Sequence, residues 1–301
     1  MGFPKTNIGG IELSRLLIGS NPFGGFSHFS KARDVWLRSY FTVERICEVL
    51  EACSARGLNG FVSGVVGKFS EALKMHEDRT GRKLHWICTP AGGGADVGGE
   101  TIEEQIDWCA KRGVDYILPH PCWTDDRLVP EKKEIIGLDD ITRRVRDLGM
   151  IPGVSTHRPE AVVVCDTRPY DVETYIQILN VIGFLMPVET DWCSRVVRQA
   201  AHPVICIKPL AAGRVMPPTG LKWTYDNCKP VDTVVCGFMS VEEANEDIDI
   251  CLEILTGAKR EEQLQVTRSK RSIMKEQSPT ARAGARHAVP LQPYGPQARR
   301  R

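Results

Sequence analysis

The stretch Arg112-Gly-Val-Asp-Tyr-Ile-Leu-Pro-His120 combines the end of a helix, a turn and a strand in nine residues. Gly113 is typical of a helix end, and the apolar run after it is typical of a strand buried on both faces. Eight such runs follow one another, with centres 25 to 44 residues apart. They are Arg15-Leu-Leu-Ile-Gly19, Gly60-Phe-Val-Ser-Gly64, Leu84-His-Trp-Ile-Cys-Thr89, Asp115-Tyr-Ile-Leu-Pro-His120, Ile151-Pro-Gly-Val-Ser155, Thr174-Tyr-Ile-Gln-Ile-Leu179, Pro203-Val-Ile-Cys-Ile-Lys208 and Asp232-Thr-Val-Val-Cys-Gly237.

Helical patterns lie between several of these runs. Thr42 precedes apolar residues at helical spacing, and Gly57 ends that pattern. Thr101 is followed three residues later by Glu104, which is the spacing of a capping box. Ser240 begins the same pattern before the last helix, which we expect to end near residue 256.

Eight strand–helix units of this length predict a (β/α)8 TIM barrel, for which about 250 residues is the usual size. The alternative is an open doubly wound sheet, which normally has a G-x-G-x-x-G turn after its first strand. Gly19-Ser-Asn-Pro-Phe-Gly-Gly25 lacks that spacing. Ile8-Gly-Gly-Ile11 predicts a short N-terminal hairpin that closes the barrel floor.

Charge divides the chain into a barrel domain, 1–257, and a tail, 258–301. The tail contains eleven Lys and Arg and three Glu, a net charge of +8, which leaves −7 for the barrel. The tail has too few apolar residues to offset its ordering entropy, so we expect it to be disordered. It is either a solvated appendage or a segment that contacts nucleic acid or anionic lipid. The barrel is not expected to bind nucleic acid.

Hydrophobic residues make up 42% of the chain, enough for a sizeable core. No run approaches the roughly 18 apolar residues that span a membrane, and the N-terminus has no secretory signal pattern. We therefore expect a soluble, cytoplasmic protein without a membrane partner. The eleven cysteines include no C-x-x-C pair, and we expect them to be reduced and mostly buried.

In such a barrel the reactive groups lie at the carboxyl ends of the strands and in the loops that follow. Three histidines lie at such positions, His28, His120 and His157, and Lys208 ends the seventh strand. Histidine clusters bind metals, but the first and fourth strands lie far apart in the ring and no carboxylate clearly completes a site. We assign no metal ligand, although a metal is not excluded. Side chains predicted to contact substrate are Asn21, His28, Trp123, Asn180 and Arg214.

Six motifs in order resemble those of the aldo-keto reductase superfamily, over most of residues 5–256. They are Ile11-Glu-Leu-Ser-Arg-Leu-Leu-Ile-Gly19, Asp115-Tyr-Ile-Leu-Pro-His120, Gly153-Val-Ser-Thr156, Gln177 with Asn180, Pro209-Leu-Ala-Ala-Gly213, and Gly237 followed by Ser240-Val-Glu-Glu-Ala-Asn-Glu-Asp-Ile248. The resemblance implies a nicotinamide cofactor, NAD(P), at the barrel mouth. It places Ser155, Gln177, Leu210, Gly213 and Gly237 near that cofactor.

The resemblance also implies a catalytic Asp, Tyr, Lys and His, of which only His120 has a match. Val62 stands in the position of the Asp, and Thr89-Pro90 replaces the family's Thr-Lys. No tyrosine lies between positions 40 and 116, so the family's proton donor is missing. No basic residue directly follows Gly237 to pair with an adenosine 2′-phosphate.

We therefore expect a small-molecule oxidoreductase with an atypical catalytic set, in which His120, His157 or Lys208 acts as the acid. One alternative is a redox-free lyase, isomerase or hydrolase that acts through the same residues and His28, with or without a metal. Another is a barrel that binds a small molecule without converting it. The sequence leaves the oligomeric state open.

Overall fold

The structure, a computed structural model, describes residues 2–93 and 99–259 of the 301-residue chain. The chain divides into two units, Met1–Lys259 and Arg260–Arg301. All described residues belong to the first unit. The expected disordered tail therefore lies outside the described residues, apart from Ala258 and Lys259.

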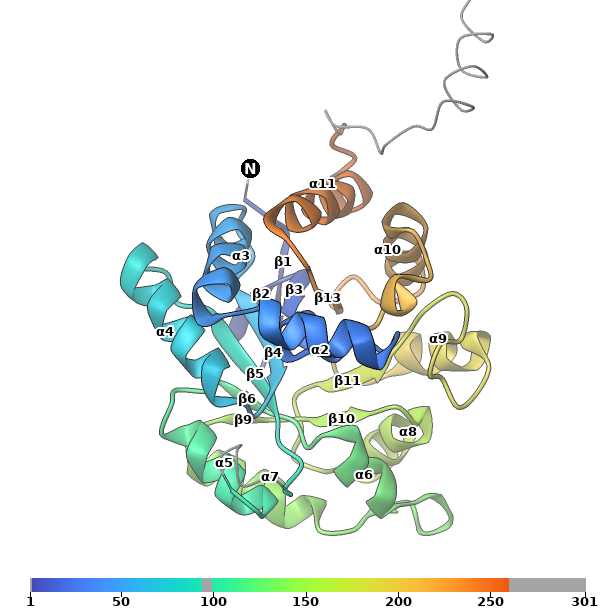
Figure 1. Cartoon of the computed structure of the whole chain (residues 1–301). Coiled ribbons are helices and arrows are strands. Elements are labelled where there is room, and N and C mark those ends of the chain that lie inside the picture. The colour runs from blue at the N-terminus through green and yellow to red at the C-terminus, as the bar shows by residue number, and fades with distance from the viewer. Residues whose placement is uncertain (1, 94–98, 260–301) are drawn as a thin grey trace, which may run out of the picture. The chain divides into compact units, whose positions relative to one another are not determined.

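Strands and helices alternate along the first unit (Figure 1). The strands are β1 (Lys5–Ile8), β2 (Ile11–Ser14), β3 (Leu16–Gly19), β4 (Gly60–Gly64), β5 (His85–Thr89), β6 (Tyr116–Ile117), β7 (Leu128–Val129), β8 (Glu134–Ile135), β9 (Ile151–Pro152), β10 (Val154–Thr156), β11 (Tyr175–Ile178), β12 (Val204–Ile207) and β13 (Thr233–Cys236). The helices are α1 (Asn21–Gly24), α2 (Lys31–Tyr40), α3 (Val43–Ala55), α4 (Gly67–Thr80), α5 (Ile102–Ala110), α6 (Pro121–Arg127), α7 (Leu138–Asp147), α8 (Pro159–Thr167), α9 (Thr190–Gln199), α10 (Pro217–Asp226) and α11 (Val241–Thr256). Each of the eight predicted strands is present.

Nine parallel strands form one sheet in the order β10-β11-β12-β13-β3-β4-β5-β6-β9. The two outermost strands are consecutive pieces of the fifth predicted strand, separated only by Gly153. Gly153 donates its N–H to Ile117 O at 3.0 Å, and Ser155 donates to Pro119 O at 3.3 Å. The hydrogen bonds that start from β6 therefore continue past the break and bring the two ends of the sheet together. The predicted (β/α)8 barrel is confirmed, and the open-sheet alternative is wrong.

Ten buried residues fill the inside of the barrel: Ile8, Leu13, Leu17, Val62, Ile87, Tyr116, Leu118, Ile176, Ile205 and Val235. Ile8 and Leu13 come from the antiparallel hairpin β1–β2, which confirms the predicted N-terminal hairpin. The Tyr116 hydroxyl donates to Ile8 O at 2.8 Å, so the hairpin is tied to the interior. A closed, apolar interior leaves the carboxyl ends of the strands as the place for chemistry.

Helix caps follow the sequence signals. The Thr42 side chain accepts the Arg45 N–H, and Thr101 forms the full capping box with Glu104. Ser240 accepts the N–H of Glu243, but the Glu243 carboxylate accepts the Met239 N–H instead of that of Ser240. The second predicted capping box is therefore shifted by one residue.

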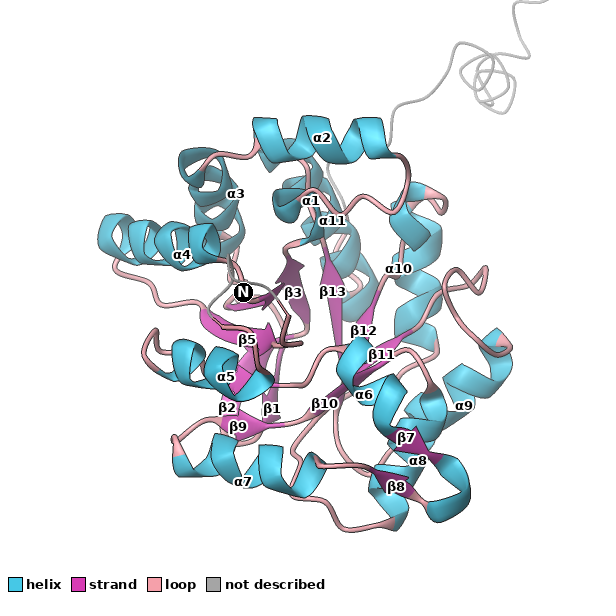
Figure 2. Ribbon diagram, turned by 60° about the horizontal axis from the view of Figure 1, so that its bottom comes forward, coloured by secondary structure: helices cyan, strands magenta, loops and turns pink. Residues whose placement is uncertain are grey.

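Helices α1 and α2 were not predicted and interrupt the path from β3 to α3. In Figure 2 they lie beyond the carboxyl ends of β3 and β13. Ser30 caps α2 by accepting the Arg33 N–H. Pro22 of α1 packs against Gly237, where a Cβ would lie 2.6 Å from the proline ring. This contact fixes where the loop after β3 begins.

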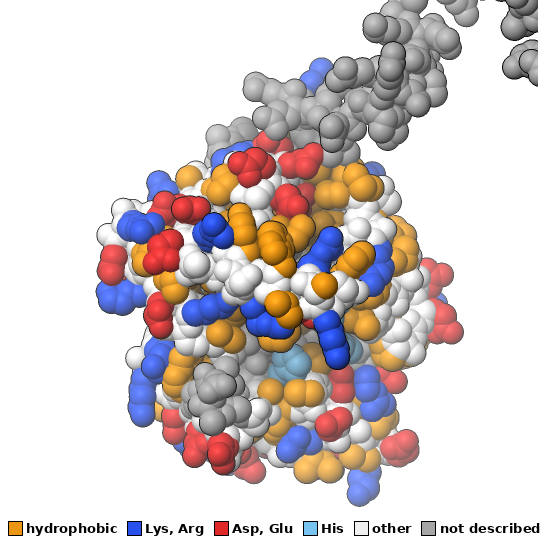
Figure 3. All heavy atoms as spheres, viewed as in Figure 1, with side chains coloured by type: hydrophobic (Ala, Val, Ile, Leu, Met, Phe, Trp, Pro, Cys, Tyr) orange, Lys and Arg blue, Asp and Glu red, His pale blue; other side chains and the backbone are white. Residues whose placement is uncertain are grey.

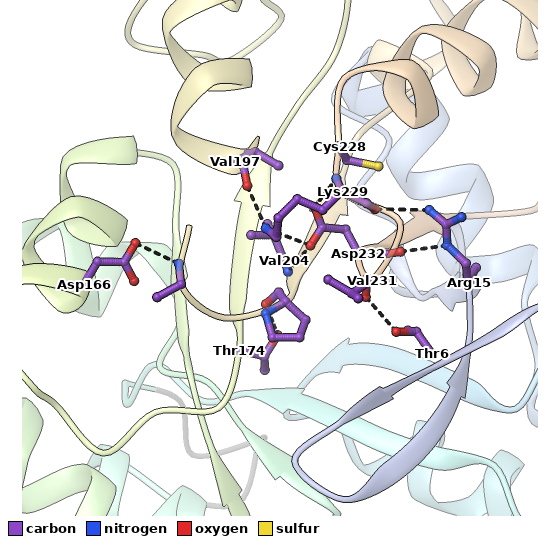
Figure 4. Close-up of polar contacts among 12 residues, drawn as sticks. Thr6, Arg15, Asp166, Thr174, Val197, Val204, Cys228, Lys229, Val231 and Asp232 are labelled. Carbon is purple, nitrogen blue, oxygen red and sulfur yellow. Dashed lines mark hydrogen bonds and ion pairs between the residues drawn. The ribbon is translucent and has the colours of Figure 1, made fainter. Parts of the chain in front are cut away.

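A polar network lies at the opposite end of the barrel, around Asp232 (Figure 4). The fully buried Asp232 carboxylate accepts the N–H groups of Val204 at 2.8 Å and Lys229 at 2.6 Å. Arg15 donates to the backbone oxygens of Asp232 and Lys229. Residues at this end of a barrel serve stability, because the strands present their carboxyl ends to the other side.

Nine of the eleven cysteines are buried and none forms a disulfide, as predicted; Cys122 is exposed and Cys228 is half-buried. Among the described residues, no helix combines the length and the apolar character that crossing a membrane requires.

Candidate active site

The loops that follow three strands meet over one side of the barrel mouth. They carry His28 after β3, Phe184 after β11, and Lys208 and Arg214 after β12. Lys208 Nζ lies 3.2 Å from His28 Nε2, and the Arg214 guanidinium donates to His28 O at 3.1 Å. The rings of His28 and Phe184 meet edge to face, with centroids 6.3 Å apart. Figure 3 shows histidine side chains in a hollow of this face, with Lys and Arg side chains beside it.

From the sequence, the three histidines were not expected to form one cluster, because the first and fourth strands lie far apart in the ring. The structure corrects this, because the chain after β3 turns back toward β12. The charges of Lys208, His120 and His28 all act on His157 and lower its pKa. We name the five residues His28, His120, His157, Lys208 and Arg214 the basic cluster.

Lys208 is a constrained member of the basic cluster. Its backbone has φ of 62°, in the left-handed region that non-glycine residues seldom adopt. Ala211, Ala212 and Gly213 also have positive φ, and such conformations, which cost about 1–3 kcal/mol each for residues other than glycine, gather at functional sites. Burial lowers the pKa of Lys208 to about 8. The side chain can therefore give up a proton near neutral pH.

His120 caps helix α6 through its own ring. Nδ1 accepts the Cys122 N–H at 3.3 Å and lies 3.1 Å from Cys122 Sγ. Because Nδ1 acts as an acceptor, the neutral ring carries its proton on Nε2. Partial burial and the Lys208 charge lower the pKa of His120, although the residue is exposed to solvent. His120 is thus a neutral hydrogen-bond donor at the rim at pH 7.

His157 follows β10 directly. Its backbone N–H donates to the Asp125 carboxylate at 3.1 Å, and the same carboxylate accepts a hydrogen bond from the Thr156 hydroxyl. Burial lowers the pKa of His157 to about 4, with further lowering by Lys208, His120 and His28. The imidazole is therefore neutral at pH 7 and does not compete with Lys208 as the acid.

Gln177 is fully buried on β11, beside the end of β10. Its amide nitrogen donates weakly to His157 O at 3.4 Å and Ile178 O at 3.3 Å. Its amide oxygen Oε1 is buried and has no hydrogen-bond partner among the described residues. A buried acceptor without a donor costs free energy, and Oε1 is such an acceptor. Ser155 on β10 is also buried, and both were predicted to lie near a cofactor.

Asn180 supports this site indirectly. Its side-chain oxygen accepts the Phe184 N–H at 2.8 Å, and its nitrogen donates to Phe184 O at 3.0 Å. Phe184 in turn stacks under Arg214, whose guanidinium carbon lies 4.4 Å from the ring centroid. Asn180 was predicted as a substrate contact, and the structure engages its amide in holding the loop that places Phe184.

The other predicted residues lie in varied surroundings. Trp123 is only 6% exposed and packs in the outer core. Asn21 is exposed at the start of α1. Leu210 is half-buried and Gly213 exposed, both in the strained loop after β12. Gly237 packs against Pro22, which alone explains a glycine there.

Val62 and Pro90 stand at the positions of the family's Asp and Lys, and their neighbours Ser63 and Thr89 form local hydrogen bonds. Val62 belongs to the barrel interior. The Ser63 hydroxyl accepts the Trp86 ring N–H at 2.8 Å, and Thr89 donates to Ser63 O. This half of the mouth therefore carries no acid or base at these positions.

Within the part of the chain that the structure describes, no group of three or more His, Cys, Asp or Glu could hold a metal ion. Asp125 is committed to Thr156 and His157, and Glu189 is an exposed residue at the start of α9. The cluster is therefore rich in imidazole nitrogen and poor in free carboxylate.

Solved structures with a similar fold include aldo-keto reductases. A Pseudomonas aeruginosa protein named as an aldo-keto reductase matches with a TM-score of 0.63 and 13% identity, covering 84% of this chain and 95% of that one. A Klebsiella pneumoniae aldo/keto reductase in complex with NADP and acetate matches with a TM-score of 0.56 and 12% identity, covering 91% and 95%.

This chain has a divergent aldo-keto reductase fold. Another Klebsiella pneumoniae aldo-keto reductase, in complex with NADPH, gives a TM-score of 0.55 and 14% identity, with coverage of 89% and 100%. A scan of family models and a search of curated proteins find no match to the sequence. The aldo-keto-reductase-like barrel thus keeps the architecture, while the residues at its mouth differ.

Proposed function

We propose that this aldo-keto-reductase-like barrel reduces the carbonyl group of a small molecule with a nicotinamide cofactor, and that Lys208 is the proton donor. The observation that carries the proposal is the Lys208–His28 pair, 3.2 Å apart at the end of β12. It supplies an acid on a barrel whose usual tyrosine donor is missing. Aldo-keto reductases of the same fold have been solved with NADP and with NADPH.

The buried residues beside the pair fit a nicotinamide. The free Oε1 of Gln177 is an acceptor without a donor, and the amide group of nicotinamide is a donor of the matching kind. Gln177 and Ser155 would hold that amide. When bound, the reduced nicotinamide supplies a hydride to the carbonyl carbon and is itself oxidised.

The chain's own residues handle the proton and the oxygen. The His120 Nε2–H donates a hydrogen bond to the carbonyl oxygen, where negative charge develops. Lys208 transfers a proton to that oxygen, which completes the alcohol and leaves a neutral amine. His28, which contacts Nζ, helps to return a proton to Lys208 from solvent. With a pKa of about 8, Lys208 is mostly an ammonium at pH 7 and can act as the acid.

The first prediction concerns Lys208. The protein should reduce a set of carbonyl compounds more slowly as pH rises through about 8, because the acid form of Lys208 disappears. The loss of NADH or NADPH absorbance measures the rate. Lys208→Met should lower kcat at least a hundredfold, within the usual range for loss of a general acid, and remove that pH dependence. Lys222→Met, at an exposed helix position paired with Asp226, is the control. An unchanged kcat in Lys208→Met would exclude Lys208 as the donor.

A second candidate reaction uses Lys208 as a nucleophile. A lysine with a lowered pKa forms Schiff bases with carbonyl compounds, with loss of water. The same burial that makes Lys208 a good acid also favours its neutral amine. Treatment with borohydride in the presence of a carbonyl compound would trap such an adduct, and mass spectrometry would locate it. Adduct formation without nicotinamide oxidation would favour a redox-free lyase or isomerase.

A further inference from the structure

The basic cluster has an excess of positive charge. Neither Lys208 nor Arg214 forms an ion pair with any described residue. Among the described residues, the carboxylates of Asp34 and Asp125 come near the cluster, but neither forms an ion pair with Lys208 or Arg214. Asp34 accepts the N–H and hydroxyl of Ser27, and Asp125 is held by Thr156 and His157. Lys208 is half-buried and Arg214 is exposed, and two neighbouring cations without an ion-pair partner favour an anionic ligand.

The Arg214 guanidinium, which we call the fork, is held in place by two backbone carbonyls and two aromatic rings. It donates to Ala211 O at 3.2 Å and His28 O at 3.1 Å. It lies over Phe184 at 4.4 Å and Phe29 at 5.8 Å from the ring centroids. Two carbonyls use two of its five N–H groups, so three remain for a ligand. A stacked, hydrogen-bonded guanidinium loses little freedom when it binds a carboxylate or phosphate.

The fork and the proposed acid lie on either side of one residue. Arg214 contacts the backbone oxygen of His28, and Lys208 contacts its ring. The two cations therefore lie at the two ends of His28, at 3.1 Å and 3.2 Å from it. That spacing suits a molecule in which a carbonyl group and an anionic group are only a few bonds apart.

We propose that the substrate is a small anionic carbonyl compound, an oxo acid or a phosphorylated carbonyl compound, whose anionic group binds Arg214 while its carbonyl oxygen faces Lys208. This inference rests on the proposed function for the fate of the carbonyl, but the anion site itself does not. Asn180 becomes a positioning residue, because it holds the phenylalanine on which Arg214 stacks.

Calorimetry on the full chain without nucleotide tests the site. The ligands are 2-oxobutanoate, dihydroxyacetone phosphate and neutral 2-butanone. At least one of the two anions should bind at least tenfold more tightly than 2-butanone, and the better one identifies the anionic group. Arg214→Gln should weaken that binding at least tenfold. Arg112→Gln is the matched control, because Arg112 also stacks on an aromatic ring, that of Trp108 at 3.9 Å, and donates to Trp108 O.

Three outcomes would overturn the proposal. They are equal affinity for 2-butanone and the anions, no loss of affinity in Arg214→Gln, and loss of NADPH binding in that variant with oxo-acid binding intact. The last result would assign Arg214 to the cofactor phosphates. If Arg214→Gln does not fold, Arg214→Lys keeps the charge without the fork and should bind at least threefold more weakly; unchanged binding would count against the fork. Binding of the anion without oxidation of any nicotinamide would support the anion site and contradict the proposed reductase.

Discussion

At the scale of single residues, the barrel mouth contains basic side chains whose pKa values are lowered by burial. His157 is the clearest case, since burial lowers its pKa from 6.5 to about 4. Between these two values the unfolded chain binds more protons than the folded one, so the free energy of unfolding falls as pH falls from 6.5 to 4.

His157→Asn should therefore make the free energy of unfolding less dependent on pH between 4 and 6.5. Urea denaturation of both proteins at several pH values measures the slope, and above pH 7 the two profiles should run parallel. An identical slope below pH 6.5 would mean that His157 is already charged in the folded protein.

At the scale of elements, the barrel closes where its fifth strand breaks. At Gly153 a Cβ would lie 2.5 Å from Thr174 O and 2.8 Å from the Leu118 side chain. Gly153→Ala should lower the free energy of unfolding by about 1–3 kcal/mol, as overpacking commonly does. Gly64→Ala is the matched control, because this strand glycine has no atom within 4 Å of the added Cβ, and it should change stability by about 0.5 kcal/mol or less. Equal melting temperatures for Gly153→Ala and the unaltered protein would show that the closure tolerates a side chain.

The elements also show which features a sequence can predict. The strands could be predicted because a strand covered on both faces must be apolar. The starts of α3 and α5 could be predicted because the Thr42 and Thr101 side chains accept backbone N–H groups of the first helical turn. Lys208 and His120 could be placed at the mouth because they directly end predicted strands. The meeting of His28 with Lys208 could not, because it depends on the path of a loop that is fixed by the contact between Pro22 and Gly237. Two local signals mark that loop: Ser27 with Asp34, whose hydrogen bonds hold the turn before α2, and Ser30, which caps α2.

At the scale of the whole molecule, the barrel keeps the aldo-keto reductase fold, but the family's catalytic residues other than His120 have no match. Val62 on β4 and Pro90 after β5 stand where the family has its Asp and Lys. The two cations of the mouth, Lys208 and Arg214, follow β12, and both contact His28 in the loop after β3. The architecture alone does not carry the activity, so the central claim depends on whether this mouth still binds a nicotinamide.

Titration of the full chain with NADH and NADPH, followed by calorimetry or nucleotide fluorescence, tests that claim most directly. We expect binding well below millimolar, with NADH at least as tight as NADPH, because no Lys or Arg directly follows Gly237 to pair with a 2′-phosphate. Gln177→Ala should weaken binding at least tenfold, about 1.4 kcal/mol, because Oε1 is the acceptor left free for the nicotinamide amide. Gln105→Ala, which removes a buried glutamine that holds the Ala91 and Gly92 N–H groups beside α5, should leave the affinity unchanged. Absence of binding by either nucleotide up to millimolar concentration would contradict the reductase and leave the redox-free enzyme and the non-catalytic binding barrel as the alternatives.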